Sequence, residues 1–388
     1  MAYALKVFRA PSTSLMIRRL NLRLTFVAVI LLAGAAVELV TEHGPSVLRP
    51  GLRMCAYVTS PADGTVTVVD LVRLAATATI PVGPAPSGVR AHPTRREIWG
   101  LSTEGGYVWV IDAPRDQVAA RIPVGAAPFA LDFSRDGSRA YVAASGSATV
   151  VAIDCATRQV VARARTGRRP WIARITPDGQ LLLVPNRDDN TLALFDAATL
   201  APVATIPVAS HPEQVVVLPD SSTAFVSAVG ANQISVVDLR HHVLLVNLPV
   251  AGTPSDLILK PDGGELYVTA PESHGLEILN TWTTEVAESM LLGSAPSHGE
   301  LTADASLLYV SDAEAGRVMP VHIGLRQLLR PIPVGQRPGV CRLNPGENLL
   351  LVVNEDSNDL AVIRVRTQSL LTLIPVGSRP RDLAVMVF

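Results

Sequence analysis

Cationic side chains recur at one point of a repeating pattern in this sequence. The residue before a recurring proline is cationic in four repeats: Arg169, His211, Arg337 and Arg379. Arg168 adds a further charge beside the first of them. Guanidinium forks suit carboxylate or phosphate groups, so this set predicts a site for an anionic ligand. Trp171 follows directly and offers a flat ring on which a planar ligand can stack.

Charged residues also interrupt segments that are otherwise apolar. His298 and Glu300 are two residues apart, so on a strand both point to one face. The same positions of other repeats hold further polar residues: Arg90, Asp132, Arg174, Gln214, Asp256, Arg342 and Asp382. These side chains either form ion pairs between neighbouring repeats along a wet channel or bind a polar ligand. The sequence leaves both interpretations open.

The cationic set has a structural alternative as well. Acidic residues in nearby loops can balance its charge: Asp188, Asp189, Glu355 and Asp356. Motifs for catalysis are missing from the sequence, which has no HExxH, no GxSxG and no glycine-rich phosphate loop. The three cysteines have no CxxC spacing. We therefore predict no catalytic residues and no metal site.

The elements that position these residues follow from one repeat. The string I/L-P-V-G/A, or a degenerate form of it, ends at residues 83, 125, 167, 209, 251, 293, 335 and 377, so every step is 42 residues. Each unit contains four short runs rich in Val, Ile and Tyr, separated by Gly, Asp and Pro turns. The period and the four strands predict the blades of a β-propeller.

The number of blades follows from the number of predicted strands. Seven complete units run from 84 to 377, residues 54–83 supply three more strands, and 378–388 supply one. The expected fold is all-β, an eight-bladed propeller whose last blade joins three N-terminal strands to one C-terminal strand. The alternative is a seven-bladed ring, which leaves three well-patterned strands unused. Closure removes the open strand edges that promote aggregation.

Recurrent phrases in the second and third strands point to a family. Tyr57–Ser60 (YVTS), Tyr141–Ala144 (YVAA) and Tyr267–Ala270 (YVTA) occupy one position, and segments such as Thr65–Asp70 (TVTVVD) follow them. With the I-P-V-G motif, residues 54–388 resemble the YVTN-repeat β-propeller family. The resemblance implies the fold. Its relatives include periplasmic proteins, archaeal surface-layer proteins, quinoprotein amine dehydrogenase subunits, d1-haem propellers and lactonase-like enzymes, so function is left open.

The N-terminus reads as an export signal. Residues 1–23 are basic, Leu24–Val37 is an uncharged apolar run, and Ala33–Ala35 is an A-x-A cleavage pattern. We predict a signal peptide over 1–35, or alternatively an uncleaved membrane anchor, then a linker over 36–53 and the propeller over 54–388. The expected location is periplasmic or extracellular, with membrane attachment only through the N-terminal segment.

Together these features favour a non-enzymatic binding or scaffold protein. Its ligand or partner, an unknown protein or a small anion, is expected at the channel mouth, where the I-P-V-G loops lie. The alternative is a lactonase-like hydrolase or a carrier of d1-haem or quinone; the first interpretation requires no cofactor. The net charge of −1 gives no general attraction to nucleic acid, and we expect a monomer.

Overall fold

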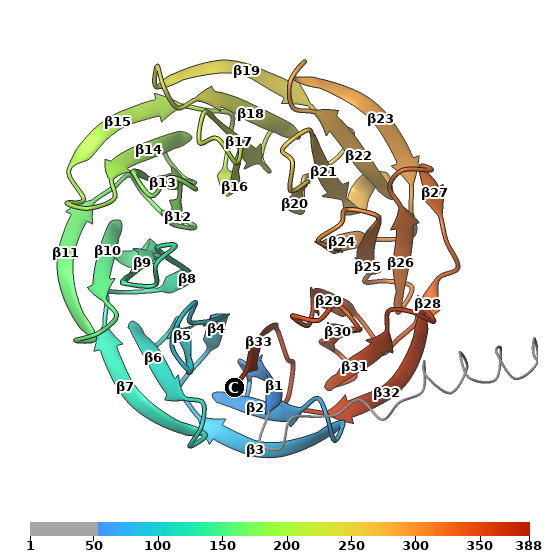
Figure 1. The fold of residues 1–388 in the computed structure, drawn as a ribbon. Coiled ribbons are helices and arrows are strands. Elements are labelled where there is room, and N and C mark those ends of the chain that lie inside the picture. The colour runs from blue at the N-terminus through green and yellow to red at the C-terminus, as the bar shows by residue number, and fades with distance from the viewer. Residues whose placement is uncertain (1–52) are drawn as a thin grey trace, which may run out of the picture. The chain divides into compact units, whose positions relative to one another are not determined.

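The computed structural model describes residues 53–388, which form a ring of eight antiparallel sheets (Figure 1). The eight-bladed propeller is therefore confirmed, and the seven-bladed alternative is wrong. The predicted signal peptide or anchor, and the linker apart from Arg53, lie outside the described residues. Between residues 53 and 388 no helix is long and apolar enough to cross a membrane.

Each blade has four strands, ordered from the channel outward. The inner strands are β4 (Pro86–Ala91), β8 (Pro128–Phe133), β12 (Arg174–Ile175), β16 (Pro212–Val217), β20 (Asp256–Leu259), β24 (Pro296–Leu301), β29 (Pro338–Leu343) and β33 (Asp382–Val387). The second strands are β1 (Met54–Ser60), β5 (Glu97–Ser102), β9 (Arg139–Ala144), β13 (Leu181–Asn186), β17 (Thr223–Ala228), β21 (Glu265–Ala270), β25 (Leu307–Asp312) and β30 (Leu349–Asn354).

The outer half of each blade follows the same order. The third strands are β2 (Thr65–Asp70), β6 (Tyr107–Asp112), β10 (Thr149–Asp154), β14 (Thr191–Asp196), β18 (Gln233–Asp238), β22 (Gly275–Asn280), β26 (Arg317–His322) and β31 (Asp359–Arg364). The outer strands are β3 (Ala75–Pro81), β7 (Gln117–Pro123), β11 (Gln159–Arg165), β15 (Pro202–Pro207), β19 (Val243–Pro249), β23 (Glu285–Leu291), the pair β27 (Gln327–Leu328) and β28 (Ile332–Pro333), and β32 (Ser369–Pro375). Two 3-10 turns, η1 (Ser145–Ser147) and η2 (Pro271–Ser273), interrupt loops.

We number the blades along the chain. Blade 1 holds β33 with β1–β3, blade 2 holds β4–β7, and the series continues to blade 8 with β29–β32. The antiparallel meander places the turns after inner and third strands on one face of the ring. The loops that lead into inner strands lie on the other face, which we call the channel mouth.

Closure of the ring is as predicted. β33 pairs with β1 in antiparallel register, with Met54 opposite Val387 and Thr59 opposite Asp382. Arg53 and Phe388 also exchange two backbone hydrogen bonds, of 2.7 and 2.9 Å. The two ends of the described chain therefore complete one blade, so β1 is not left as an open edge, and β33 becomes its inner strand, as in the other blades.

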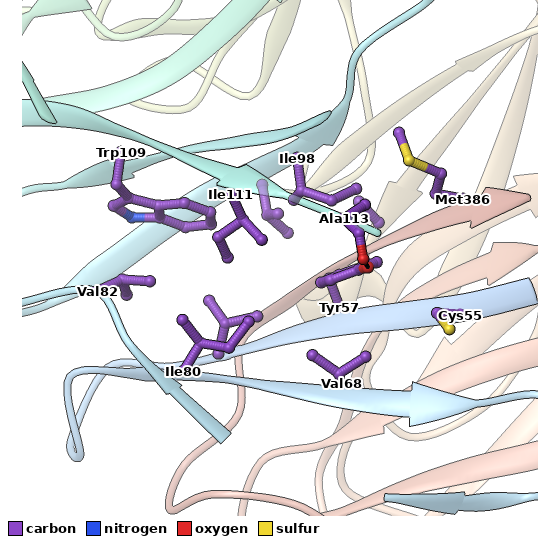
Figure 2. Packing of buried hydrophobic residues seen from close by; sticks show 13 residues of the cluster. Cys55, Tyr57, Val68, Ile80, Val82, Ile98, Trp109, Ile111, Ala113 and Met386 are labelled. Atoms are coloured by element: carbon purple, nitrogen blue, oxygen red, sulfur yellow. Dashed lines mark hydrogen bonds between the residues drawn. The ribbon is translucent and has the colours of Figure 1, made fainter. Parts of the chain in front are cut away.

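Large side chains on the second strands fill the space between blades. They are almost fully buried at every repeat: Tyr57, Trp99, Tyr141, Leu183, Phe225, Tyr267, Tyr309 and Leu351. Figure 2 shows one such core, in which Tyr57 and Val68 of blade 1 pack against Ile98 and Ile111 of blade 2. Burying a side chain of this size contributes about 1.5–3 kcal/mol, so each blade is stabilised mainly by its neighbours.

Blade 4 departs from this regularity at its inner strand. In blade 5 the N–H of Gln214 donates to the hydroxyl of Ser227, at 2.9 Å. Pro185 holds the position of Ser227 in blade 4 and has no N–H to donate to the inner strand. The N–H of Trp171 still donates to the carbonyl of Pro185 at 3.0 Å, but residues 171–173 form no strand and only Arg174–Ile175 remain as β12. Trp171 therefore lies on irregular backbone beside the channel.

Candidate functional site

The inner strands surround a cavity of about 460 Å³ on the axis of the ring. We call it the channel cavity; its walls include Phe129, Trp171, Asp256, His298 and Arg381. Small-molecule sites in proteins typically enclose 300–1,000 Å³, so this cavity has the size of a ligand site. Each blade contributes inner-strand residues, so the cavity exists only in the closed ring.

The predicted polar face of the inner strands does line the cavity. It includes His298, Glu300 and their counterparts in other blades: Arg90, Asp132, Arg174, Gln214, Asp256, Arg342 and Asp382. The alternation of side chains along a strand thus placed these groups correctly.

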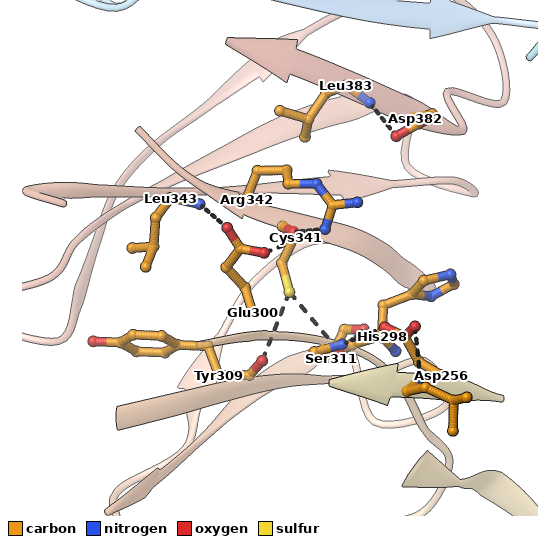
Figure 3. Close-up of polar contacts among 12 residues, drawn as sticks. Asp256, His298, Glu300, Tyr309, Ser311, Cys341, Arg342, Leu343, Asp382 and Leu383 are labelled. Atoms are coloured by element: carbon orange, nitrogen blue, oxygen red, sulfur yellow. Dashed lines mark hydrogen bonds and ion pairs between the residues drawn. The ribbon is translucent and has the colours of Figure 1, made fainter. Parts of the chain in front are cut away.

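Most of these charges form ion pairs between neighbouring blades. The distances are 3.4 Å for Arg90 and Asp382, 3.3 Å for Arg174 and Asp132, and 3.3 Å for Arg342 and Glu300 (the last shown in Figure 3). Burial raises the pKa of Glu300, and the neighbouring Arg342 opposes that shift. Burial also lowers the pKa of Arg90, which Asp382 opposes. The inter-blade interpretation therefore holds for these three pairs.

The channel carboxylates also bind backbone of the next blade. Four backbone N–H groups donate to them: Ile175 to Asp132 (3.3 Å), Gly299 to Asp256 (3.1 Å), Leu343 to Glu300 (3.1 Å) and Val89 to Asp382 (3.1 Å). Hydrogen bonds to ionised acceptors are stronger than neutral ones. These four acids thus connect adjacent inner strands, which is a structural role.

Two cavity residues are not used in this way. Arg381 is exposed to the channel, and no acid pairs with it among residues 53–388. His298 is fixed through its backbone, since its N–H donates to Ser311 Oγ at 3.2 Å (Figure 3). The Nδ1 atom of His298 is buried without a hydrogen-bond partner in the described part of the chain. A ligand can therefore bind these two side chains without breaking an existing pair.

The arginines of the mouth are arranged differently. Their guanidinium nitrogens lie close to carboxylate oxygens of neighbouring loops. The distances are 2.6 Å from Arg168 to Asp189, 3.7 Å from Arg169 to Asp188 and 3.4 Å from Arg337 to Glu355. Three of the four acids that the sequence offered as balancing charges, Asp188, Asp189 and Glu355, thus pair with them, whereas Asp356 forms no ion pair within residues 53–388. Neither these arginines nor His211 and Arg379 line the channel cavity.

The backbone explains the position of these residues. Arg169, His211, Arg337 and Arg379 all have φ between 51° and 55°, in the left-handed region. Ala85 and Ala127 adopt the same conformation at the equivalent points of blades 2 and 3. The left-handed turn therefore does not depend on a charged side chain.

Trp171 belongs to an aromatic pair that the sequence analysis missed. Its ring centroid is 4.3 Å from that of Phe129, at an interplanar angle of 34°. The guanidinium of Arg187 lies 5.3 Å from the same Trp171 ring and 3.2 Å from the carboxylate of Glu213. Burial raises the pKa of Glu213. A signal existed, because Phe129, Trp171 and Glu213 occupy one position of three consecutive repeats.

Other reactive groups in the described residues offer little chemistry. No three His, Cys, Asp or Glu residues between 53 and 388 are arranged to hold a metal ion. The thiols of Cys55, Cys155 and Cys341 are buried and free. Burial raises the pKa of all three, that of Cys155 to about 12, so they stay protonated at neutral pH.

Comparison with known proteins identifies one family and several similar folds. The profile of the YNCE-like beta-propeller family matches residues 105–308, more than half of the chain. No curated protein matches the sequence.

Among solved structures, dihydro-heme d1 dehydrogenase NirN in complex with DHE has a TM-score of 0.73 and 16% identity, covering 85% of this chain and 74% of its own. Apo AztD from Citrobacter koseri has a TM-score of 0.65 and 14% identity, covering 87% and 98%. Hydrazine synthase from Kuenenia stuttgartiensis has a TM-score of 0.60 and 20% identity, covering 72% and 95%. At these identities the likeness concerns the fold alone.

Proposed function

The chain belongs to the YNCE-like β-propeller family, and we propose that it is an exported, non-enzymatic binding protein that holds a small anionic ligand in the channel cavity. One observation carries the proposal: Arg381 lines the cavity, and no acid in residues 53–388 pairs with it. The arginine fork suits a carboxylate or phosphate. The ligand enters from the mouth and binds below the loops that the sequence analysis favoured.

Binding is favoured over catalysis by the state of the other charged groups. The carboxylates of Asp132, Glu300 and Asp382 each form an ion pair with an arginine and accept a hydrogen bond from a backbone N–H. A general acid or base must exchange protons with a substrate at a positioned atom. Groups held in this way stabilise the ring and leave the cavity as a rigid container.

The test is recovery of the bound molecule. The full chain is purified from its native host under non-denaturing conditions, and native mass spectrometry detects what accompanies it. The Arg381→Ala variant is expected to lose the ligand. Arg135→Ala is the matched control, because Arg135 is exposed in the turn between β8 and β9 on the opposite face. Retention of an acidic ligand by Arg381→Ala would overturn the proposal.

Export is supported by the order of basic segment, apolar run and A-x-A pattern in residues 1–35. We expect cleavage near Ala35 or Ala36, and N-terminal sequencing of protein from the extracytoplasmic fraction measures it. A mature chain that starts at Met1 or Met16 in the cytosol would contradict export.

A second candidate function rests on His298. His298 and Arg381 both line the cavity, so the imidazole would hold the iron of a haem-type cofactor and the guanidinium would hold its carboxylates. When bound, such a group would supply redox chemistry. A visible absorption spectrum of the native protein distinguishes this carrier from the binding protein, and His298→Ala is expected to alter the spectrum if a cofactor is present.

A further inference from the structure

The channel cavity has an aromatic side and a polar side. Phe129 on β8 and Trp171 just before β12 line it from blades 3 and 4, whereas His298 on β24 lines it from blade 7. Figure 1 shows β8 and β12 across the ring from β24 and β29. Arg381 lines the cavity from blade 1, just before β33. A ligand in the cavity therefore meets aromatic rings on one side and charged or polar groups on the other.

The repeat pattern shows which residues stand opposite the aromatic pair. Phe129 and Trp171 occupy the same position of adjacent units, and four blades further on this position holds Ser297 and Gly339. Blades four apart in an eight-bladed ring face one another. Neither of these two small residues lines the cavity, whose wall in blades 7 and 8 includes His298 and Val340. The two large rings therefore have no ring of equal size at the equivalent positions across the cavity.

The aromatic wall is fixed in the ligand-free protein. The two rings contact each other at 4.3 Å between centroids, and Arg187 lies over Trp171 while its guanidinium pairs with Glu213. Side chains held by such contacts lose little further conformational freedom on binding. The wall is therefore prepared for a flat molecule.

The sign of the ligand's charge follows from the pairing of the cavity groups. Three carboxylates pair with arginines, and the fourth, Asp256, accepts the N–H groups of Leu257 and Gly299. Glu213 pairs with Arg187. Arg90, Arg174 and Arg342 have acids as partners, so Arg381 is the cavity cation to which residues 53–388 supply no acid. A bound anion is thus favoured over a bound cation.

Resting on the proposed function, we infer that the ligand is an aryl carboxylate. Its ring lies against Phe129 and Trp171, and its carboxylate binds Arg381. A flat ring stacks on an aromatic side chain, whereas a saturated ring of the same carbon skeleton cannot. The inference narrows the ligand class from any small anion to one with an aromatic body.

Isothermal titration of the full chain with three matched probes tests this. The probes are 1-naphthoate, its saturated analogue decahydro-1-naphthoate, and the cation 1-naphthylmethylamine. We expect 1-naphthoate to bind about 10-fold more tightly than the saturated acid, the size expected for one stacking contact. The amine is expected not to bind.

Single substitutions distinguish the contribution of aromatic stacking to binding from that of the contact between the carboxylate and Arg381. Trp171→Leu and Phe129→Leu are each expected to weaken 1-naphthoate about 10-fold and to leave the saturated acid nearly unchanged. Arg381→Gln is expected to weaken both acids. The control is Trp282→Leu, since Trp282 is 76% exposed in the turn after β22 on the opposite face. If Trp171→Leu melts at a lower temperature, Phe129→Leu decides the result.

The outcomes are distinct. Equal binding of both acids, lost in Arg381→Gln, would overturn the aryl ligand and keep the anion-binding function. Tighter binding of the amine would overturn both. Absence of binding by all three probes, in a protein that still carries an acidic ligand from its host, would overturn the aryl carboxylate alone.

Discussion

The carboxylate of Asp382 accepts the backbone N–H of Val89 at 3.1 Å and lies 3.4 Å from the guanidinium of Arg90. Asp382 belongs to the strand that completes blade 1, whereas Val89 and Arg90 belong to the first uninterrupted blade. One side chain thus connects the C-terminal strand to the blade that follows it in the ring. Asp132 and Glu300 also contact an arginine and a backbone N–H at two other seams, although there the N–H belongs to the residue after the arginine.

Replacing this acid is expected to weaken closure of the ring. Asp382→Asn removes the charge that compensates the partly buried Arg90 and leaves a weaker acceptor for Val89. We expect a loss of about 1–3 kcal/mol in the free energy of unfolding, measured by denaturant titration. The control Asp356→Asn changes an exposed loop acid and is expected to stay within about 0.5 kcal/mol of the wild type. Equal losses in both variants would show that the contact is not specific.

In blade 2 a small and a large residue, Gly100 and Trp109, are directly paired on adjacent strands β5 and β6. Gly100 stands where the other blades have Val, and a Cβ at this position would overlap Cζ2 of Trp109. Gly100→Val is therefore expected to overpack the sheet and cost about 1–3 kcal/mol or more. The double variant Gly100→Val, Trp109→Val copies the pair Val142 and Val151 of blade 3.

A double-mutant cycle measures the coupling between these two residues. Trp109→Val alone is expected to leave a cavity, at a cost of about 3–5 kcal/mol. The double variant should lose less stability than the two single changes added together, because the new Val fills part of that space. Simple additivity would contradict the direct contact.

The buried carboxyl group of Glu277 is expected to make the free energy of unfolding depend on pH. It is buried, its Oε1 accepts the N–H of Ala251 at 2.8 Å, and its Oε2 has no partner in the described structure. Burial raises the pKa of this carboxyl above the unfolded value of about 4.3. The folded state therefore holds the proton more tightly, and stability falls as the pH rises from about 4 through the folded pKa.

Removing the ionisable group should reverse that loss. Glu277→Gln keeps the acceptor for Ala251, so we expect it to be more stable than wild type at pH 7 by on the order of 1 kcal/mol. At pH 4 the two proteins should melt at nearly the same temperature. Glu285→Gln, an exposed change on β23, serves as the control. A constant difference at both pH values would exclude ionisation as the cause.

Replacing two arginines of the channel mouth tests whether the ligand binds at the mouth or in the channel cavity. The side chains of Arg169 and Arg337 are 51% and 58% exposed in their ion pairs. Exposed pairs contribute about 0–1 kcal/mol, so Arg169→Ala with Arg337→Ala should hardly change the melting temperature. We expect native-ligand binding to fall less than in Arg381→Ala. The reverse order would place the ligand at the mouth, where the sequence analysis put it.

The fold was predictable because the repeat keeps one length. Every blade has the same period without insertion, so the core column from Tyr57 to Leu351 and the strand borders could be assigned in register. The count of strands left at the two ends then required closure between Met54–Ser60 and Asp382–Val387. Only local exceptions, such as Pro185 in blade 4, changed the length of a strand.

The site was only partly predictable, for a geometrical reason. Strict alternation placed His298 and Glu300 in the channel, but several inner strands shift register just after their first proline, as between Pro128 and Leu131. Two adjacent residues can then face the axis, so Phe129 joins the lining although the period-two pattern excludes it. Arg381 lines the cavity from the residue directly before β33, where the alternation of a strand does not apply. The pairing of the rim arginines with Asp188, Asp189 and Glu355 was one of the two interpretations that the sequence left open, because residue types alone do not decide between an internal acid and a ligand.

The backbone of Arg53 exchanges two hydrogen bonds with that of Phe388, so the ring has no intrinsic starting blade. A short peptide between these residues would make the propeller circular, and a cut in any exposed turn would give it new ends. Such a circular permutant should fold to the same eight blades with a different one assembled from both ends. The order in which the blades are synthesised can therefore be changed without changing which blades are neighbours.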